Sequence, residues 1–224
     1  TYRTAPMDFK WPEGIEEVPQ LVGMDGDVAR FKDGTTRQID AIVLCTGYKH
    51  HFPFLADELR LRTKNVLYPA NLYKGVFWLD NPKLMYLGMQ DQFYTMTLFD
   101  AEAWYARDYV LGRVSLPSRE EMAADIESWV QRESTLTDDA GMIDFQADHV
   151  AELLAEVDYP KFDLDLTRKL FRDWEHDKQE SITGYRDRGF PSPCTGTEAP
   201  THHTPWWEAM DDSLETFLNA PKQS

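Results

Sequence analysis

A run of apolar residues at 41–45, AIVLC, constrains the fold of this chain more than any other feature. These residues do not alternate with polar ones, so the strand that they predict has to be buried on both faces, as in a parallel sheet. The run ends at Thr46-Gly47-Tyr48, where a glycine lets another group approach the backbone closely. The sequence therefore predicts a parallel strand, with Cys45 buried as a small apolar side chain.

The residues before this strand predict an antiparallel meander. Three short segments, at 20–25, 27–32 and 35–40, are joined by Asp-Gly pairs. Asp-Gly favours tight hairpin turns, because glycine accepts the positive φ that these turns require.

The rest of the chain predicts short strands followed by helices. Apolar segments at 75–79 and 84–89 flank a turn at Asp80-Asn81-Pro82. Helical periodicity then dominates. The first predicted helix begins at residue 98 and ends at a C-cap, Gly112. The second begins at an N-cap, Ser118, and Glu121 completes a capping box there. Three more helices are predicted over 145–157, 166–179 and 205–218.

This order predicts an α/β fold: a meander and a parallel strand, followed by a helix-rich region. No strand is followed by a crossover helix and a second parallel strand. We therefore expect most of the sheet that residues 41–45 join to lie outside this chain. The chain also begins at Thr1 without Met, as an internal segment of a longer polypeptide would.

Composition excludes some partners. The chain has 224 residues, 42% of them hydrophobic, which is enough for a core. Its formal charge of -16 opposes binding to nucleic acids and to anionic membranes. There is no apolar stretch of membrane-spanning length and no signal-peptide pattern, so we expect a cytoplasmic location. The adjacent histidines at 50–51 and 202–203 lack partners at ligand spacing, and no metal site is predicted.

Several stretches, taken together, resemble the C-terminal half of the class B flavin-containing monooxygenases, and most closely the bacterial members that oxygenate trimethylamine. The resemblance covers nearly the whole chain. It implies that residues 1–52 are the C-terminal part of an NADPH-binding domain and 53–224 the C-terminal part of an FAD-binding domain. The stretches are YRTAPM, DAIVLCTGYKHHFPFL, NLYKGVFW, GMQDQFYTMTLFDAEAWYARD, LPSREEM and HHTPWWEAMDDSLE.

The resemblance implies an NADPH- and FAD-dependent monooxygenase that converts trimethylamine and O2 to trimethylamine N-oxide. The glycine-rich GxGxxG loops that bind both nucleotides in this family do not occur in the sequence. We therefore expect this chain to be inactive alone, to need an N-terminal half, either in the same polypeptide or in a separate chain, and to form a homodimer when complete.

The family pattern also assigns roles to individual residues. Asp91 and Gln92 are the catalytic candidates: Asp91 borders the active-site cavity, and Gln92 contacts the flavin and nicotinamide region together with Thr95. Phe93 stands where the family pattern has Trp; it keeps an apolar ring and lacks the indole N–H. The remaining cofactor-binding candidates are Arg3 and Thr4 at the 2'-phosphate of NADPH, Thr46 and Gly47 beside FAD, and Trp174 and Arg186 at the adenine end of NADPH.

Two other classes of function stay open. The chain could be a non-catalytic acidic interaction module that pairs an exposed sheet edge with a partner. It could also belong to another flavin monooxygenase that oxygenates sulfur, hydroxylates nitrogen, or inserts oxygen beside a ketone in a Baeyer–Villiger reaction.

Overall fold

The computed structural model describes residues 9–45, 49–62 and 65–198. Its first element is the predicted meander. Strands β1 (Leu21–Asp25), β2 (Val28–Phe31) and β3 (Thr36–Gln38) pair antiparallel in the order β1-β2-β3. Gly26 and Gly34 take positive φ angles of 63° and 85° in the two turns, as the Asp-Gly pairs predict.

The prediction of a buried strand at residues 41–45 is wrong for the part of the chain that the structure describes. These residues form no strand, and all five are exposed. Val43 is 85% exposed and Leu44 75%, and Cys45 is exposed too. The physical reason is that no strand among the described residues pairs with this segment, so neither its backbone groups nor its side chains are covered.

A two-stranded hairpin precedes the helices. It consists of β4 (Leu72–Tyr73) and β5 (Phe77–Trp78), which pair antiparallel. The predicted strand at 75–79 thus overlaps β5, whereas the one at 84–89 is reduced to a single bridge between Phe77 and Met85. The turn predicted at residues 80–82 is present, because the N–H of Leu84 donates to the carbonyl of Asn81 at 2.9 Å.

Helix α1 (Thr95–Val110) ends as its sequence predicts. Gly112 follows it with φ +70°, and its N–H donates to the carbonyl of Tyr109 at 3.0 Å. The N–H of Arg113 donates to the carbonyl of Asp108 at 2.8 Å. These two bonds form a Schellman motif, which satisfies carbonyl groups that the helix end leaves free.

The other helices begin at side-chain caps. The predicted capping box of Ser118 and Glu121 starts α2 (Arg119–Glu133). Asp138 caps α3 (Asp139–Ala155) by accepting from the N–H of Gly141, so this helix starts six residues before the predicted position. Helix α4 (Leu164–Glu180) has Asp163 as its cap. The helix predicted at 205–218 lies outside the described residues.

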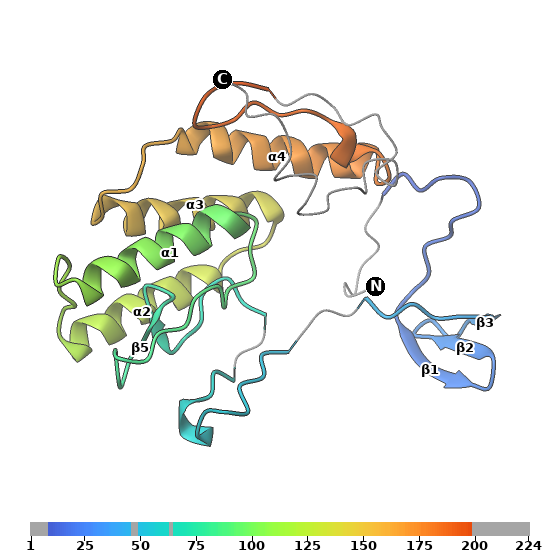
Figure 1. Ribbon diagram of the computed structural model, residues 1–224. Coiled ribbons are helices and arrows are strands. Elements are labelled where there is room, and N and C mark those ends of the chain that lie inside the picture. The colour runs from blue at the N-terminus through green and yellow to red at the C-terminus, as the bar shows by residue number, and fades with distance from the viewer. Residues whose placement is uncertain (1–8, 46–48, 63–64, 199–224) are drawn as a thin grey trace, which may run out of the picture.

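The helices pack around one main core (Figure 1). Helix α3 lies against both α1 and α4, and α2 packs against β4. Fully buried core side chains include Phe77, Leu98, Tyr105, Ile143 and Phe145. In Figure 1 the sheet of β1, β2 and β3 lies to one side of these helices. The predicted mixed α/β fold is confirmed, apart from the parallel strand. No helix in the described ranges combines the length and apolarity needed to span a bilayer.

Two short 3-10 helices complete the described elements. The first, η1 (Asp57–Leu59), lies near a smaller apolar cluster that contains Leu61, Trp78 and Tyr86. The second, η2 (Tyr185–Asp187), packs against α4. It places Tyr185 and Arg186 beside that helix.

Candidate active site

The segment 88–95, which follows β5 and ends at the first residue of α1, carries four of the six predicted site residues that the structure describes. A buried carboxyl group holds its first part. Glu102 of α1 has no exposed surface and accepts hydrogen bonds from the N–H of Gly88, at 2.8 Å, and from the side-chain amide of Gln90. Burial raises the pKa of Glu102 to about 8, against smaller opposing effects of these two hydrogen bonds. Glu102 therefore fixes the entry to the segment.

A buried amide holds the second part of the segment. The side chain of Gln146, on α3, is 1% exposed. Its Oε1 accepts from the N–H of Phe93 at 2.7 Å, and its Nε2 donates to the carbonyl of Asp91. The N–H of Asp91 donates in turn to the carbonyl of Val66 at 2.8 Å. The main chain from 91 to 93 is thus tied to the core on both sides.

These contacts use the main chain of residues 91–93, so the side chains of the predicted site residues remain free to contact a ligand. Asp91 and Thr95 are exposed, and Gln92 is half-buried. The side-chain oxygen of Gln92 is buried and has no hydrogen-bond partner among the described residues. A buried acceptor without a partner costs free energy unless a ligand supplies a donor. Gln92 therefore fits an N–H donor such as those of a flavin ring or of the nicotinamide amide.

The local structure explains why position 88 is a glycine. Its φ is +71°, and a Cβ there would lie 2.4 Å from Cε1 of Phe99. The ring of Phe99 therefore packs against the backbone of Gly88, and this contact within the protein explains the glycine.

Phe93 and Tyr94 connect the segment to α4. The ring of Phe171 lies 6.4 Å from that of Phe93 and 4.5 Å from that of Tyr94, measured between centroids. Tyr94 is 1% exposed, and burial raises the pKa of its hydroxyl. The aromatic side chain at 93 thus packs against the helix that also carries Trp174.

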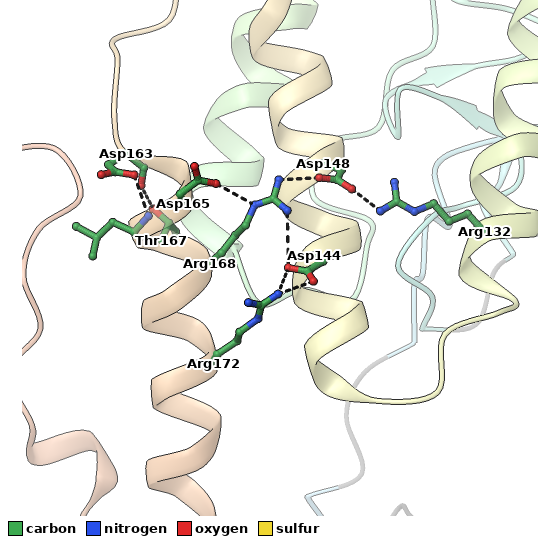
Figure 2. A network of polar contacts seen from close by, with 9 residues as sticks. Arg132, Asp144, Asp148, Asp163, Asp165, Thr167, Arg168 and Arg172 are labelled. Carbon is green, nitrogen blue, oxygen red and sulfur yellow. Dashed lines mark hydrogen bonds and ion pairs between the residues drawn. The ribbon is translucent and has the colours of Figure 1, made fainter.

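A ladder of arginine and aspartate side chains joins α2, α3 and α4 (Figure 2). Asp148 accepts from Arg132 of α2 and, at 2.6 Å, from Arg168 of α4. Asp144 accepts from Arg172 at 2.5 Å. Burial raises the pKa of Asp148, but the two arginines outweigh it and hold this pKa below its ordinary value. The ladder fixes α3 and α4 side by side.

Trp174 and Arg186 are brought together through Tyr185. The rings of Trp174 and Tyr185 meet edge to face, with centroids 5.1 Å apart. The Arg186 guanidinium lies 5.3 Å from the Tyr185 ring centroid, and its Nε donates to the Tyr185 hydroxyl at 2.8 Å. Lys178 lies 5.0 Å from the Trp174 ring centroid. Their contact with adenine stays a prediction.

The other candidates cannot be placed. Arg3, Thr4, Thr46 and Gly47 lie outside the described residues. Among the residues that are described, no group of three or more His, Cys, Asp or Glu side chains is arranged to hold a metal ion. A cavity of about 580 Å³ lies away from segment 88–95, between the start of α3 and α4, where it is lined by residues such as Asp138, Arg172 and His176.

Sequence reasoning missed Glu102 and Gln146. Both signals were present in the helical pattern: Glu102 lies one turn from Leu98 and from Tyr105, and Gln146 lies one turn from Ile143 and from Val150. A polar residue on the apolar face of a helix predicts a buried hydrogen-bond partner.

Comparisons with known proteins identify the relatives of this chain. The family model described as FMO-like, flavin-binding monooxygenase-like, matches residues 15–168. The chain is 54% identical to trimethylamine monooxygenase from Methylocella silvestris, over 99% of this chain and 49% of that protein. It is 55% identical to trimethylamine monooxygenase from Pelagibacter ubique, over 97% of this chain and 49% of that protein.

Solved structures give the same result. The crystal structure of Tmm from Pelagibacter sp. strain HTCC7211 matches with a TM-score of 0.87 and 54% identity, covering 96% of this chain and 49% of that one. S-allyl-L-cysteine S-oxygenase from Allium sativum matches with a TM-score of 0.55 and 26% identity, covering 72% of this chain and 38% of that one. The chain therefore spans about half the length of these two curated relatives.

Proposed function

The chain belongs to the flavin-binding monooxygenase-like family, and we propose that it forms part of an enzyme that uses FAD, NADPH and O2 to oxygenate trimethylamine to trimethylamine N-oxide. One observation carries this proposal. Five relatives named trimethylamine monooxygenase are 51–55% identical to this chain over 97–99% of its length. Bound flavin would supply the oxygen-transfer chemistry, and the protein would supply position and exclude water.

In this proposal the segment 88–95 is the part of the chain nearest to the reaction. The oxygen of Gln92, which has no partner among the described residues, accepts an N–H from the flavin or the nicotinamide amide. Thr95 offers an exposed hydroxyl one turn before Phe99, and the exposed Asp91 borders the active-site cavity of the complete enzyme, as the family pattern implies. The aromatic ring of Phe93 keeps this region apolar, which suits a neutral amine, the form whose nitrogen has a free electron pair.

The nucleotide contacts follow the family pattern. Arg3 and Thr4 bind the 2'-phosphate of NADPH, where a guanidinium can form two parallel hydrogen bonds. The backbone at Thr46 and Gly47 borders FAD. The pair of Trp174 and Arg186 serves the adenine end, and the mutual contacts through Tyr185 support a shared role.

The partner in this proposal is the remaining half of the enzyme. It would supply the GxGxxG loops, which this sequence lacks, and a sheet edge for residues 41–45. The exposure of Val43 and Leu44 supports such pairing, because neighbouring large apolar side chains are normally covered by other parts of the protein. Residues 1–52 then complete the NADPH-binding domain and 53–224 the FAD-binding domain, and the complete enzyme forms a homodimer.

N-oxygenation is favoured over S-oxygenation by the comparisons. The relative from Arabidopsis thaliana named flavin-containing monooxygenase FMO GS-OX3 is 37% identical over 47% of this chain. The Allium S-oxygenase is 26% identical. Both likenesses are weaker and shorter than those to the trimethylamine monooxygenases, so trimethylamine is the proposed substrate.

Substrate-dependent consumption of NADPH by the full-length protein tests the proposal. We expect yellow protein and rapid NADPH oxidation with trimethylamine, and slower oxidation with a methyl sulfide or a ketone. Faster turnover of the sulfide or of the ketone would show that this compound, and not trimethylamine, is the preferred substrate. Colourless full-length protein that oxidises no NADPH would favour the non-catalytic interaction module.

A further inference from the structure

We propose that Gln146 is a positioning residue for Gln92, a role that rests on the function proposed above. The Gln146 amide bonds to the main chain on both sides of Gln92. It donates to the carbonyl of Asp91 and accepts from the N–H of Phe93 at 2.7 Å. Gln92 is therefore the residue enclosed by the two contacts, and its direction is set by them.

The two contacts require an amide at position 146. One contact needs a donor and the other an acceptor, and a primary amide carries both on one planar group. An ionised glutamate of the same size would present two acceptors and leave the Asp91 carbonyl facing an oxygen, whereas a protonated one could still donate to that carbonyl. A methionine would offer neither hydrogen bond, and would leave buried main-chain groups without partners.

The helix that carries Gln146 is itself held in place. Asp144 and Asp148, two residues before and after it, pair with Arg172 and Arg168 of α4 (Figure 2). Asp148 also accepts from Arg132 of α2. The clamp on residues 91–93 thus rests on a helix that is fixed from both neighbouring helices, so the position of Gln92 is set before any ligand arrives.

This arrangement has a functional consequence. The Gln92 oxygen is buried and without a partner among the described residues, so it is ready to accept a donor. A main chain fixed in advance loses little conformational entropy when a ligand binds. Gln146 contacts the main chain at residues 91 and 93, and its effect on the cofactor passes through Gln92.

The test compares Gln146→Glu and Gln146→Met with wild type in the full-length, FAD-containing protein. The matched control is Gln131→Glu, the same change at an exposed glutamine of α2. The measurements are the NADP+ dissociation constant by calorimetry, the visible circular dichroism of the flavin, and the melting temperature without NADP+. We expect both Gln146 variants to bind NADP+ about tenfold more weakly and to change the flavin spectrum, and the control to match wild type.

The outcomes separate this role from a purely structural one and from the proposed function. Wild-type NADP+ affinity and flavin dichroism in Gln146→Met, even with a lowered melting temperature, would overturn the positioning role alone. If Gln146→Met does not fold, Gln146→Glu decides the matter at a pH where the introduced carboxyl group is ionised and has lost its donor: wild-type NADP+ affinity there would overturn the role. A wild-type protein that binds no NADP+ would overturn the proposed function, and this role with it.

Discussion

The carboxyl group of Glu102 has no exposed surface and accepts a hydrogen bond from the backbone N–H of Gly88 at 2.8 Å. Burial raises its pKa to about 8, so the protonated form predominates at neutral pH. The Gln90 oxygen has no partner among the described residues. Rotation of that amide by half a turn would let it accept the Glu102 proton.

The proton on Glu102 predicts a pH dependence of stability. The unfolded chain releases this proton near its ordinary pKa of 4.5, whereas the folded protein holds it up to about pH 8. The contribution of Glu102 to the free energy of unfolding is therefore complete below pH 4.5 and falls as pH rises towards 8, by about 1.4 kcal/mol per pH unit at most. Glutamine resembles the neutral form, so Glu102→Gln should fold and lack this decline. Urea unfolding across this range measures it, and equal pH slopes in wild type and variant would refute the prediction.

His149 predicts the opposite pH dependence at the acid end. It is 1% exposed and lies against the rings of Tyr68 and Trp129, with centroids 5.3 and 5.2 Å away. Burial, aided by the charge of Lys74, lowers its pKa from 6.5 to about 3. The stability that it contributes is present above pH 6.5 and is lost as pH falls towards 3, because only the unfolded chain takes up the proton. His149→Phe should shift the midpoint of acid unfolding to lower pH, as monitored by tryptophan fluorescence; an unshifted midpoint would contradict this.

Two glycines with similar backbone angles predict unequal costs of substitution. Gly88 has φ +71° and Gly112 has φ +70°, so an alanine at either position costs about 1 kcal/mol of backbone strain. Only at Gly88 would the added Cβ meet the Phe99 ring, 2.4 Å away, whereas nothing lies within 4 Å at Gly112. Gly88→Ala should therefore lower the free energy of unfolding by roughly 1–3 kcal/mol more than Gly112→Ala. Adding Phe99→Leu to Gly88→Ala should recover part of the loss, and equal losses for the two single variants would exclude the clash.

The arginine ladder predicts a measurable contribution from a partly buried pair. Arg168 contacts Asp148 at 2.6 Å and is 24% exposed, whereas the pair of Lys169 and Asp173 is 69% and 45% exposed. Arg168→Met should lower the free energy of unfolding by about 1–2 kcal/mol, because it removes the charge-assisted link from α4 to Asp148. Lys169→Met, the neighbouring control, should cost under about 0.5 kcal/mol. Equal costs would show that the ladder adds nothing beyond a surface pair.

Local chemistry explains what could be predicted from the sequence. The meander, the Gly112 end of α1 and the Ser118 capping box depend on residues close together in the chain, and all three predictions are confirmed. The burial of residues 41–45 depends on partner strands, and no partner strand is present among the described residues. The helical pattern marks Gln146 as a buried polar residue but cannot give its partners, because Gln146 lies 53 residues from Phe93 and meets it only when α3 packs on α1.

The central claim is that this chain belongs to an enzyme that transfers oxygen from O2 to trimethylamine. The most direct measurement supplies the full-length protein with NADPH, trimethylamine and oxygen-18-labelled O2, and determines the mass of the product. We expect trimethylamine N-oxide with one oxygen-18 atom, formed only when NADPH is present. An N-oxide without the label, or NADPH oxidation without any N-oxide, would contradict it.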